Sequence, residues 1–249
     1  MGSYNNSTLV YLPIVGGQYK HFVPMGWALY GGVVPYKNKL KMAEKGERIL
    51  NWYATDQWMQ YPSFMPYLRG KDYIVPTQTV SELAKKYPGR IWCLWNEPDL
   101  PTQDWIEPKM AIDLTNEWVN AIGDNGFIAG YGVNINNSMY WAYWLDSFLN
   151  NGGYVPKYMH IHIYAENAVE WYKMYEIWDK WNKSSGHNFR TIISEAGGNL
   201  NENQFTSGWQ SVYHFLKQWE NEDVESVYFY TDTPQFFDKE LEELWMNEQ

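Results

Sequence analysis

Short apolar runs alternate with segments of helical periodicity along most of this 249-residue chain, and this alternation limits its fold more than any other feature. An apolar run of about four to eight residues is typical of a buried strand, whereas apolar residues three or four positions apart indicate a helix. Strands are expected at 22–29, 47–53, 63–68, 90–95, 127–133, 158–164, 190–193 and 224–230. Helices are expected at about 81–86, 108–122, 140–149, 168–182 and 205–220, and the acidic run at 238–248 is typical of a solvated helix face.

Eight strands separated by helices predict a parallel sheet with right-handed crossovers, which can close on itself. The length of the chain agrees with the roughly 250 residues of a (β/α)8 barrel. No linker-like tract, charge block or internal repeat divides the sequence. We therefore expect an α/β protein with a single (β/α)8 TIM barrel, one domain over residues 1–249 with the barrel proper at about 22–240.

The composition points away from nucleic acid and toward carbohydrate. The formal net charge is −10, so a polyanionic partner would be repelled and no nucleic-acid partner is expected. Aromatic residues make up 18% of the chain, with 15 Trp and 21 Tyr, which is more than a barrel lined by Val, Ile and Leu requires. Flat rings can lie against the apolar faces of sugars, so this excess favours a carbohydrate groove.

Cysteine and membrane signals add little. The single cysteine, Cys93, lies inside the expected strand at 90–95, where a small buried hydrophobe is favoured over a nucleophile. No run is long and apolar enough to predict a membrane span, so no membrane partner is expected. We expect a monomer that works outside the cell or at its surface, although this chain carries no export signal.

Two glutamates follow expected strands and carry the main functional prediction. Glu97 comes after the strand at 90–95 and Glu195 after the strand at 190–193, so the two are 98 residues apart, about three βα units of a barrel of this size. The carboxyl ends of the strands form the edge where barrel enzymes hold their catalytic residues. Most glycoside hydrolases cleave the glycosidic bond with a pair of carboxyl groups, and two strand ends that converge can supply such a pair.

Their neighbours suggest different roles for the two acids. Apolar residues before Glu97 and Pro98 after it create a fixed, low-dielectric setting that disfavours a charged carboxylate, as a general acid requires. Asn96 can donate to a sugar 2-hydroxyl, a contact that strengthens in the transition state. Small residues after Glu195 let a sugar approach closely, which suits a nucleophile.

Further candidate substrate contacts stand at other strand ends. His162 and Tyr164 share one face of the strand at 158–164, where the tyrosine hydroxyl can hydrogen-bond Glu195 and keep it ionised. His160 lies one pleat lower, which favours a core role. The remaining candidates could equally be scaffold; they are Asn51, Trp52, Trp95, Tyr131, Asn134, Tyr228 and Tyr230.

Two other readings stay open. A zinc hydrolase could be built on His160 and His162, but it needs at least a third ligand. A sugar-binding barrel without catalysis would keep the groove and lack turnover. For the glycosidase reading no metal and no organic cofactor is expected, and the partner is a polysaccharide or oligosaccharide substrate.

The residues around the two glutamates resemble a known group. Asn96-Glu97-Pro98 after one strand and Glu195 after another is similar to the signature of the clan A retaining glycoside hydrolases. Within that clan the chain most resembles glycoside hydrolase family 128, compact barrels that act on β-1,3-glucan. The likeness runs from about residue 50 to 230; it is closest at 96–103 (NEPDLPTQ) with Trp118, at 144–149 (WLDSFL), at 162–164 (HIY) and at 193–195 (ISE).

The resemblance implies an endo-β-1,3-glucanase of the laminarin or curdlan type, with Glu195 as nucleophile and Glu97 as acid and base. Retention of configuration requires carboxyl groups about 5–5.5 Å apart, against about 6.5–9.5 Å for inversion. The chain departs from the family's usual residues at Ile163, where tryptophan is usual, and at Ser194, where threonine is usual. These departures leave the preferred linkage open, and a clan A β-1,4-glycanase is the alternative enzyme.

Overall fold

The computed structural model describes residues 22–29, 44, 46, 48–52, 54–70, 73–136, 138–198 and 205–231. Its strands form one sheet of parallel pairs in the order β3-β2-β1-β9-β8-β7-β6-β5-β4. The strands are β1 (Met25–Leu29), β2 (Ile49–Leu50), β3 (Phe64–Met65), β4 (Tyr67–Leu68), β5 (Arg90–Asn96), β6 (Gly126–Asn134), β7 (Tyr158–Ala165), β8 (Arg190–Gly198) and β9 (Val224–Thr231).

The two ends of this strand order meet at Pro66. β3 pairs with β2, and β4 pairs with β5. Pro66 stands between these two short strands and has no N–H to donate, but its carbonyl accepts from the Cys93 N–H at 2.9 Å. β3 and β4 therefore act as one barrel strand that is interrupted at Pro66. The (β/α)8 barrel predicted from the sequence is confirmed.

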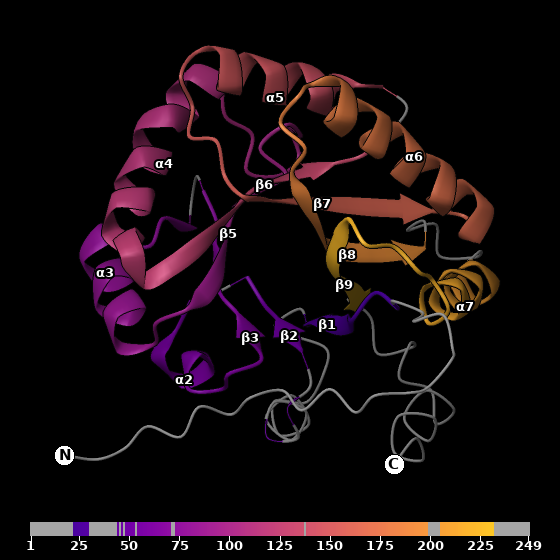
Figure 1. Cartoon of the computed structure of the whole chain (residues 1–249), viewed down its shortest axis with the longest axis horizontal. Helices are drawn as coiled ribbons and strands as arrows, with labels where there is room; N and C mark the ends of the chain where they lie inside the picture. The colour runs from indigo at the N-terminus through magenta and orange to yellow at the C-terminus, as the bar shows by residue number, and fades with distance from the viewer. Residues whose placement is uncertain are drawn as a thin grey trace, which may run out of the picture.

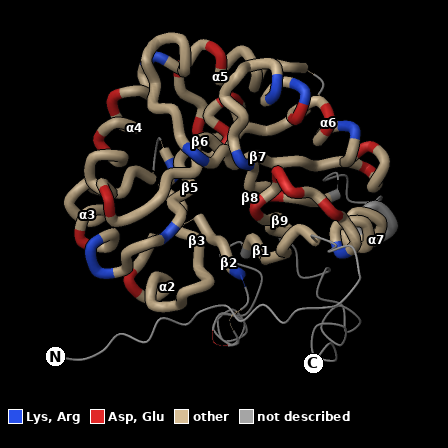
Figure 2. The backbone as a smooth tube through the Cα atoms, viewed as in Figure 1, with Lys and Arg blue, Asp and Glu red and all other residues tan. Residues whose placement is uncertain are grey.

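Helices surround this ring of strands (Figure 1). They are α2 (Asp56–Met59), α3 (Thr77–Lys86), α4 (Pro108–Ile122), α5 (Tyr140–Asn150), α6 (Ala168–Ser184) and α7 (Phe205–Leu216), with a 3-10 turn η2 at Gly123–Asn125. Charged residues of both signs lie along the outer helices (Figure 2). Among the described residues, no helix combines the length and the apolar character needed to cross a bilayer.

Several element bounds differ from those expected. β1 begins at Met25 rather than at residue 22, because Pro24 cannot donate to a neighbouring strand. α3 begins at Thr77, four residues earlier than expected, and α7 ends at Leu216. β8 continues past 193 to Gly198 and so contains Glu195. Residues 47 and 53 of the second expected strand, and the acidic run at 238–248, lie outside the described residues.

Two apolar layers hold the barrel together. One lies between the strands and the helices, and the other fills the inside of the ring. Alternation along β7 supplies both: Met159, Ile161 and Ile163 point to the outer layer, whereas the residues between them face inward. Fully buried tryptophans dominate the large side chains of the described core; they are Trp92, Trp95, Trp118, Trp141, Trp144, Trp171 and Trp178. Much of the tryptophan excess thus serves packing between layers rather than a sugar groove.

Candidate active site

The polar residues expected at the strand ends gather at one edge of the barrel. Asn96, the last residue of β5, lies beside Gly132 of β6. Asn134, the last residue of β6, lies beside His162 of β7, which lies beside Glu195 of β8. Register shifts in both of these pairings bring the three side chains to the same level. Strand pairing alone therefore assembles most of the candidate site.

An unusual backbone turns Glu97 toward this site. Trp95 and Glu97 have φ angles of +64° and +48°, values that residues with a Cβ rarely adopt and that cluster at functional sites. The Glu97 N–H donates to the Gly132 carbonyl at 2.7 Å. A Cβ on Gly132 would lie 2.6 Å from the Trp95 carbonyl oxygen and 2.5 Å from the His160 ring, so only glycine fits there.

Glu97 is 6% exposed and has two polar partners. Its Oε1 accepts from the Asn134 side-chain amide at 2.7 Å and lies 2.9 Å from Nδ1 of His162. The Asn134 backbone N–H in turn donates to Asp99 at 3.3 Å. Asn134 therefore links the carboxyl groups of Glu97 and Asp99.

Glu195 is 5% exposed and receives donors at both oxygens. Oε1 accepts from the Trp52 indole N–H at 2.8 Å, and Tyr164 donates its hydroxyl to Oε2. Burial raises the pKa of the Glu195 carboxyl, and the charge of Glu97 adds to this effect. His162, Tyr164 and Trp52 oppose the rise by favouring the carboxylate.

His162 lies between the two glutamates and is fully buried. Nδ1 contacts Glu97 at 2.9 Å, and Nε2 lies 3.4 Å from Oε1 of Glu195. Burial alone lowers the pKa of His162, but the carboxylates of Glu195 and Glu97 outweigh it and the pKa is raised. A protonated imidazole donates from both ring nitrogens, so one side chain can serve both acids.

The two glutamate carboxyl groups lie close together. Ligand atoms of Glu97, His162 and Glu195 all fall within 4.8 Å of one another, so an oxygen of one carboxylate lies within 4.8 Å of an oxygen of the other. This arrangement also has the donor types of a three-ligand metal site. His160 is not in the set, because Ser194 Oγ and the Leu94 carbonyl occupy its two nitrogens at 2.8 Å each. Burial lowers the pKa of His160 to about 3, which keeps it neutral in the core.

Trp52 and Tyr230 complete one side of the site. The Trp52 N–H donates to Asn96 Oδ1 at 2.9 Å as well as to Glu195, which fixes the indole between the ends of β5 and β8. Tyr230 packs edge-on against both Trp52 and Tyr164, with ring centroids 5.5 and 5.8 Å away. Asn51, next to Trp52 at the end of β2, is also buried.

Three predicted contacts are placed elsewhere. Trp95 points outward, where its N–H donates to Thr115 of α4 at 2.9 Å; this happens because its left-handed backbone breaks the alternation of β5. Tyr131 also points outward and donates to the Tyr154 carbonyl, because the register of β6 shifts between Gly130 and Val133. Tyr228 belongs to the apolar cluster inside the ring, where burial raises its pKa to about 12.

The structure adds three residues to those expected. The Tyr67 hydroxyl lies 3.0 Å from the Trp95 carbonyl and 3.3 Å from Nε2 of His162. Gln103 accepts from the Asn96 amide at 3.4 Å. Asp99 is fully buried, and burial together with the charge of Glu97 raises its pKa to about 7. The inward alternation of Tyr67 was the only sequence signal for it, whereas the other two depend on the path of the loop after β5.

No protein-family model and no curated protein matches this sequence. Solved structures do match. An endo-β-1,3-glucanase of glycoside hydrolase family 128 from Amycolatopsis mediterranei, in complex with laminaritriose, is 17% identical and has a TM-score of 0.63 over 83% of this chain and 88% of that chain. A curdlan-specific exo-β-1,3-glucanase from Blastomyces gilchristii, in complex with glucose, is 16% identical with a TM-score of 0.63 over 86% and 91%. An endo-β-1,3-glucanase from Lentinula edodes is 18% identical with a TM-score of 0.60 over 83% and 82%. At these identities the similarity establishes a shared fold.

Proposed function

We propose that this protein is a retaining glycoside hydrolase that cleaves β-1,3-glucan. The observation that carries the proposal is the closeness of two glutamates. Glu97 directly follows β5 and Glu195 lies in β8, and a carboxylate oxygen of one lies within 4.8 Å of a carboxylate oxygen of the other. Oxygens this close agree better with the roughly 5–5.5 Å between the carboxyl groups of a retaining enzyme than with the roughly 6.5–9.5 Å of an inverting one.

In the first step, Glu195 attacks the anomeric carbon while Glu97 protonates the departing glycosidic oxygen. In the second step, Glu97 removes a proton from water, which attacks the same carbon and releases Glu195. The donors from Trp52 and Tyr164 hold Glu195 in one orientation and stabilise its charge. Asn134 and His162 both contact Oε1 of Glu97 and so orient its carboxyl group.

The solved structures of similar fold support both the substrate and the pair of acids. The similar proteins are β-1,3-glucanases of endo and exo types. Two of the structures are variants of the A. mediterranei enzyme, each with one glutamate replaced by alanine and each with bound laminari-oligosaccharide. The two replaced glutamates are 97 residues apart in that enzyme, and the two proposed here are 98 residues apart.

The test is turnover of laminarin and curdlan beside β-1,4-glucan, xylan and mannan. We expect β-1,3-glucan to be hydrolysed, with losses on the order of 10³-fold or more in Glu97→Gln and in Glu195→Gln. Glu117→Gln, on the exposed face of α4, is the matched control and should keep the wild-type rate. Proton NMR of the first product should show the β-anomer, because two displacements retain configuration.

Binding of laminari-oligosaccharide without turnover would instead identify a sugar-binding barrel. Turnover confined to β-1,4-glycans would keep the mechanism and replace the substrate.

A further inference from the structure

The loop after β5 carries a buried acid that the mechanism above does not use. Asp99 comes two residues after Glu97, and its side chain is fully buried. Oδ1 accepts from the backbone N–H of Asn134 at 3.3 Å, whereas Oδ2 has no hydrogen-bond partner among the described residues. Burial of a carboxyl group with an unpaired oxygen costs free energy, and such a cost beside an active site points to a function for the group.

The strand pairing shows which bond Oδ1 replaces. In a parallel pair, a residue that donates to the neighbouring strand also accepts, through its carbonyl, from the residue two positions further along that strand. The Glu97 N–H donates to the Gly132 carbonyl at 2.7 Å, so in a continued strand the Glu97 carbonyl would accept from the Asn134 N–H. It accepts instead from the Leu100 N–H at 3.0 Å, because the chain turns at Glu97, where φ is +48°. Asp99 thus supplies the acceptor that this turn takes away from Asn134.

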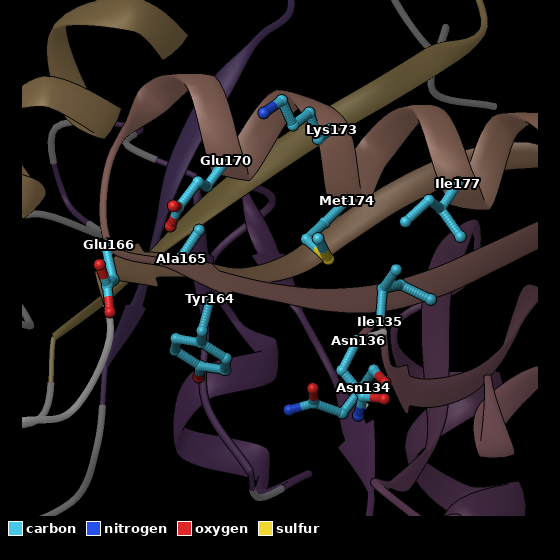
Figure 3. Close-up of a pocket in the computed structure, with 10 residues that line it drawn as sticks. All are labelled: Asn134, Ile135, Asn136, Tyr164, Ala165, Glu166, Glu170, Lys173, Met174 and Ile177. Atoms are coloured by element: carbon cyan, nitrogen blue, oxygen red, sulfur yellow. Dashed lines mark hydrogen bonds between the residues drawn. The ribbon is translucent and has the colours of Figure 1, made fainter. Parts of the chain in front are cut away.

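The bond to Asp99 fixes the backbone of a residue whose side chain contacts Glu97. Asn134 donates from its side-chain amide to Oε1 of Glu97 at 2.7 Å. The same side chain lies on the wall of a cavity of about 480 Å³, which Asn136 and Tyr164 also line (Figure 3). Because packing does not enclose the amide on the cavity side, its direction depends on the hydrogen bonds that hold its backbone. Asp99 provides one of these bonds, and the Asn136 amide provides another by donating to the Asn134 carbonyl at 3.2 Å.

We propose that Asp99 is a positioning residue that holds Glu97 in place for proton transfer, and that it acts through Asn134. This proposal rests on the hydrolysis proposed above. Asp99 acts on the reaction through two other side chains, so it is not itself a catalytic residue.

The chemistry of the first step separates an effect on Glu97 from an effect on Glu195. A bond forms between Glu195 and the anomeric carbon, the bond from that carbon to the leaving oxygen breaks, and this oxygen takes the proton of Glu97. A sugar leaving group needs that proton, whereas dinitrophenolate leaves as a stable anion without it. Glu195 takes its donors from Trp52 and Tyr164. A displaced Glu97 should therefore slow the reactions that need the proton and spare those that do not.

Laminaripentaose and dinitrophenyl β-laminaribioside distinguish these cases at about pH 5.5, where Asp99 is neutral because its pKa is raised to about 7. We expect Asp99→Ala to lower kcat/KM for the pentaose about ten-fold more than kcat/KM for the aryl substrate. Asp99→Leu fills the same space without an acceptor and should change the ratio equally. Asp99→Asn keeps an oxygen for the Asn134 N–H and should keep the wild-type ratio. The fraction of folded protein cancels in this ratio, so a loss of stability alone does not move it.

Three further variants test the route. Tyr164→Phe removes a donor to Glu195, so it should slow both substrates alike and keep the ratio. Asp124→Asn, at an exposed acid, should keep both rates. In an Asn134→Ala background, Asp99→Ala should change the ratio no further, because the contact that links Asp99 to Glu97 is already lost.

Equal losses on the two substrates in Asp99→Ala and Asp99→Leu would show a purely structural residue and overturn the assignment. A ten-fold change in the ratio that persists in the Asn134→Ala background would overturn it as well, since Asp99 would then act by another route. Failure of the wild type on both substrates would overturn the proposed function itself, and the two failures are thus distinguishable.

Discussion

At the residue scale, the site places two carboxyl groups close together, with one histidine between them. When both are ionised, two negative charges about 5 Å apart repel by about 3 kcal/mol at an effective dielectric constant of 20. His162 lies between Glu97 and Glu195 and contacts both, so its imidazolium offsets this repulsion. Its complete burial argues for this electrostatic role over the direct sugar contact expected from the sequence. In the proposed mechanism, the sugar-facing role at this level falls to Trp52, Asn96 and Tyr164.

Replacing Tyr164 by phenylalanine should shift the pH dependence of hydrolysis in a known direction. The Tyr164 hydroxyl lowers the pKa of Glu195 by stabilising its carboxylate, against burial, which raises that pKa. Without the hydroxyl the pKa rises further, so the acid limb of the kcat/KM profile should move to higher pH. The rate at the optimum should fall by about ten-fold, as for a lost hydrogen bond to a charged group.

Tyr140→Phe is the control for this change, because Tyr140 is exposed at the start of α5. Its profile should overlay that of the wild type. An acid limb that stays in place in Tyr164→Phe, or moves to lower pH, would contradict the role given to this hydroxyl.

The sequence predicted that Glu97 and Glu195 meet at one edge of the barrel because each follows a short apolar run that is typical of a buried strand. It failed at Trp95 and Tyr131 for a physical reason. Simple alternation places both side chains inward, but a left-handed residue in β5 and a register shift in β6 turn them outward. Asp99 was out of reach as well, since its position depends on how the loop after β5 folds back.

At the element scale, hydrogen bonds within the loop between β5 and α4 hold this loop in one conformation and fix the end of β5. Its backbone closes on itself where the Asp104 N–H donates to the Asn96 carbonyl at 3.3 Å and the Ile106 N–H to the Pro98 carbonyl at 3.2 Å. Arg69, which follows β4, donates through two nitrogens to the two oxygens of Asp104 at 3.1 and 3.0 Å. The interrupted strand made of β3 and β4 thus holds, through Arg69, the loop that carries Glu97.

Arg69→Lys should therefore weaken catalysis without touching the reacting groups. A lysine keeps the charge but cannot make the two-pronged contact with Asp104. Because the pair is largely buried, we expect a loss of about 1–3 kcal/mol in unfolding free energy and a several-fold lower kcat. Thermal unfolding and laminarin turnover measure the two effects.

The matched comparison is Lys86→Met, which breaks the exposed pair with Asp56. Exposed pairs contribute little, so neither stability nor turnover should change appreciably. If Lys86→Met and Arg69→Lys had equal effects on turnover, the contact between Arg69 and Asp104 would have no special part in placing Glu97.

The bounds of the elements show where sequence patterns suffice. α4 was expected at 108–122 and occupies those residues, because Pro108 suits a first helical position and Gly123 provides a stop. β8 was expected to end at 193 but continues to Gly198, because pairing with β7 extends through residues that carry no apolar signal. Local pattern thus sets the ends of α4, whereas the partner strand sets the end of β8.

At the scale of the whole molecule, the buried ionisable groups of the site couple its stability to pH. Glu195, His162 and Asp99 all have raised pKa values in the folded protein. A group of this kind stabilises the fold below its unfolded pKa, and the contribution is lost as pH rises through the folded value. All three therefore act in the same direction, and the protein should become less stable between about pH 4 and pH 8.

Asp99 provides the cleanest test of this coupling. Its Oδ2 is buried with no hydrogen-bond partner, and burial with the charge of Glu97 raises its pKa from 3.8 to about 7. Ionisation of such a carboxyl costs up to about 4 kcal/mol relative to the unfolded chain. Asparagine cannot ionise, so Asp99→Asn should unfold at a higher temperature than the wild type at pH 8, by several degrees, and at the same or a slightly lower temperature at pH 4.5.

Thermal unfolding of both proteins across this range measures the crossover, and Asp124→Asn, at an exposed acid, should follow the wild type throughout. If Asp99→Asn ran parallel to the wild type at every pH, Asp99 would not hold a proton in the native state, and the fall in stability would have to come from Glu195 and His162 alone.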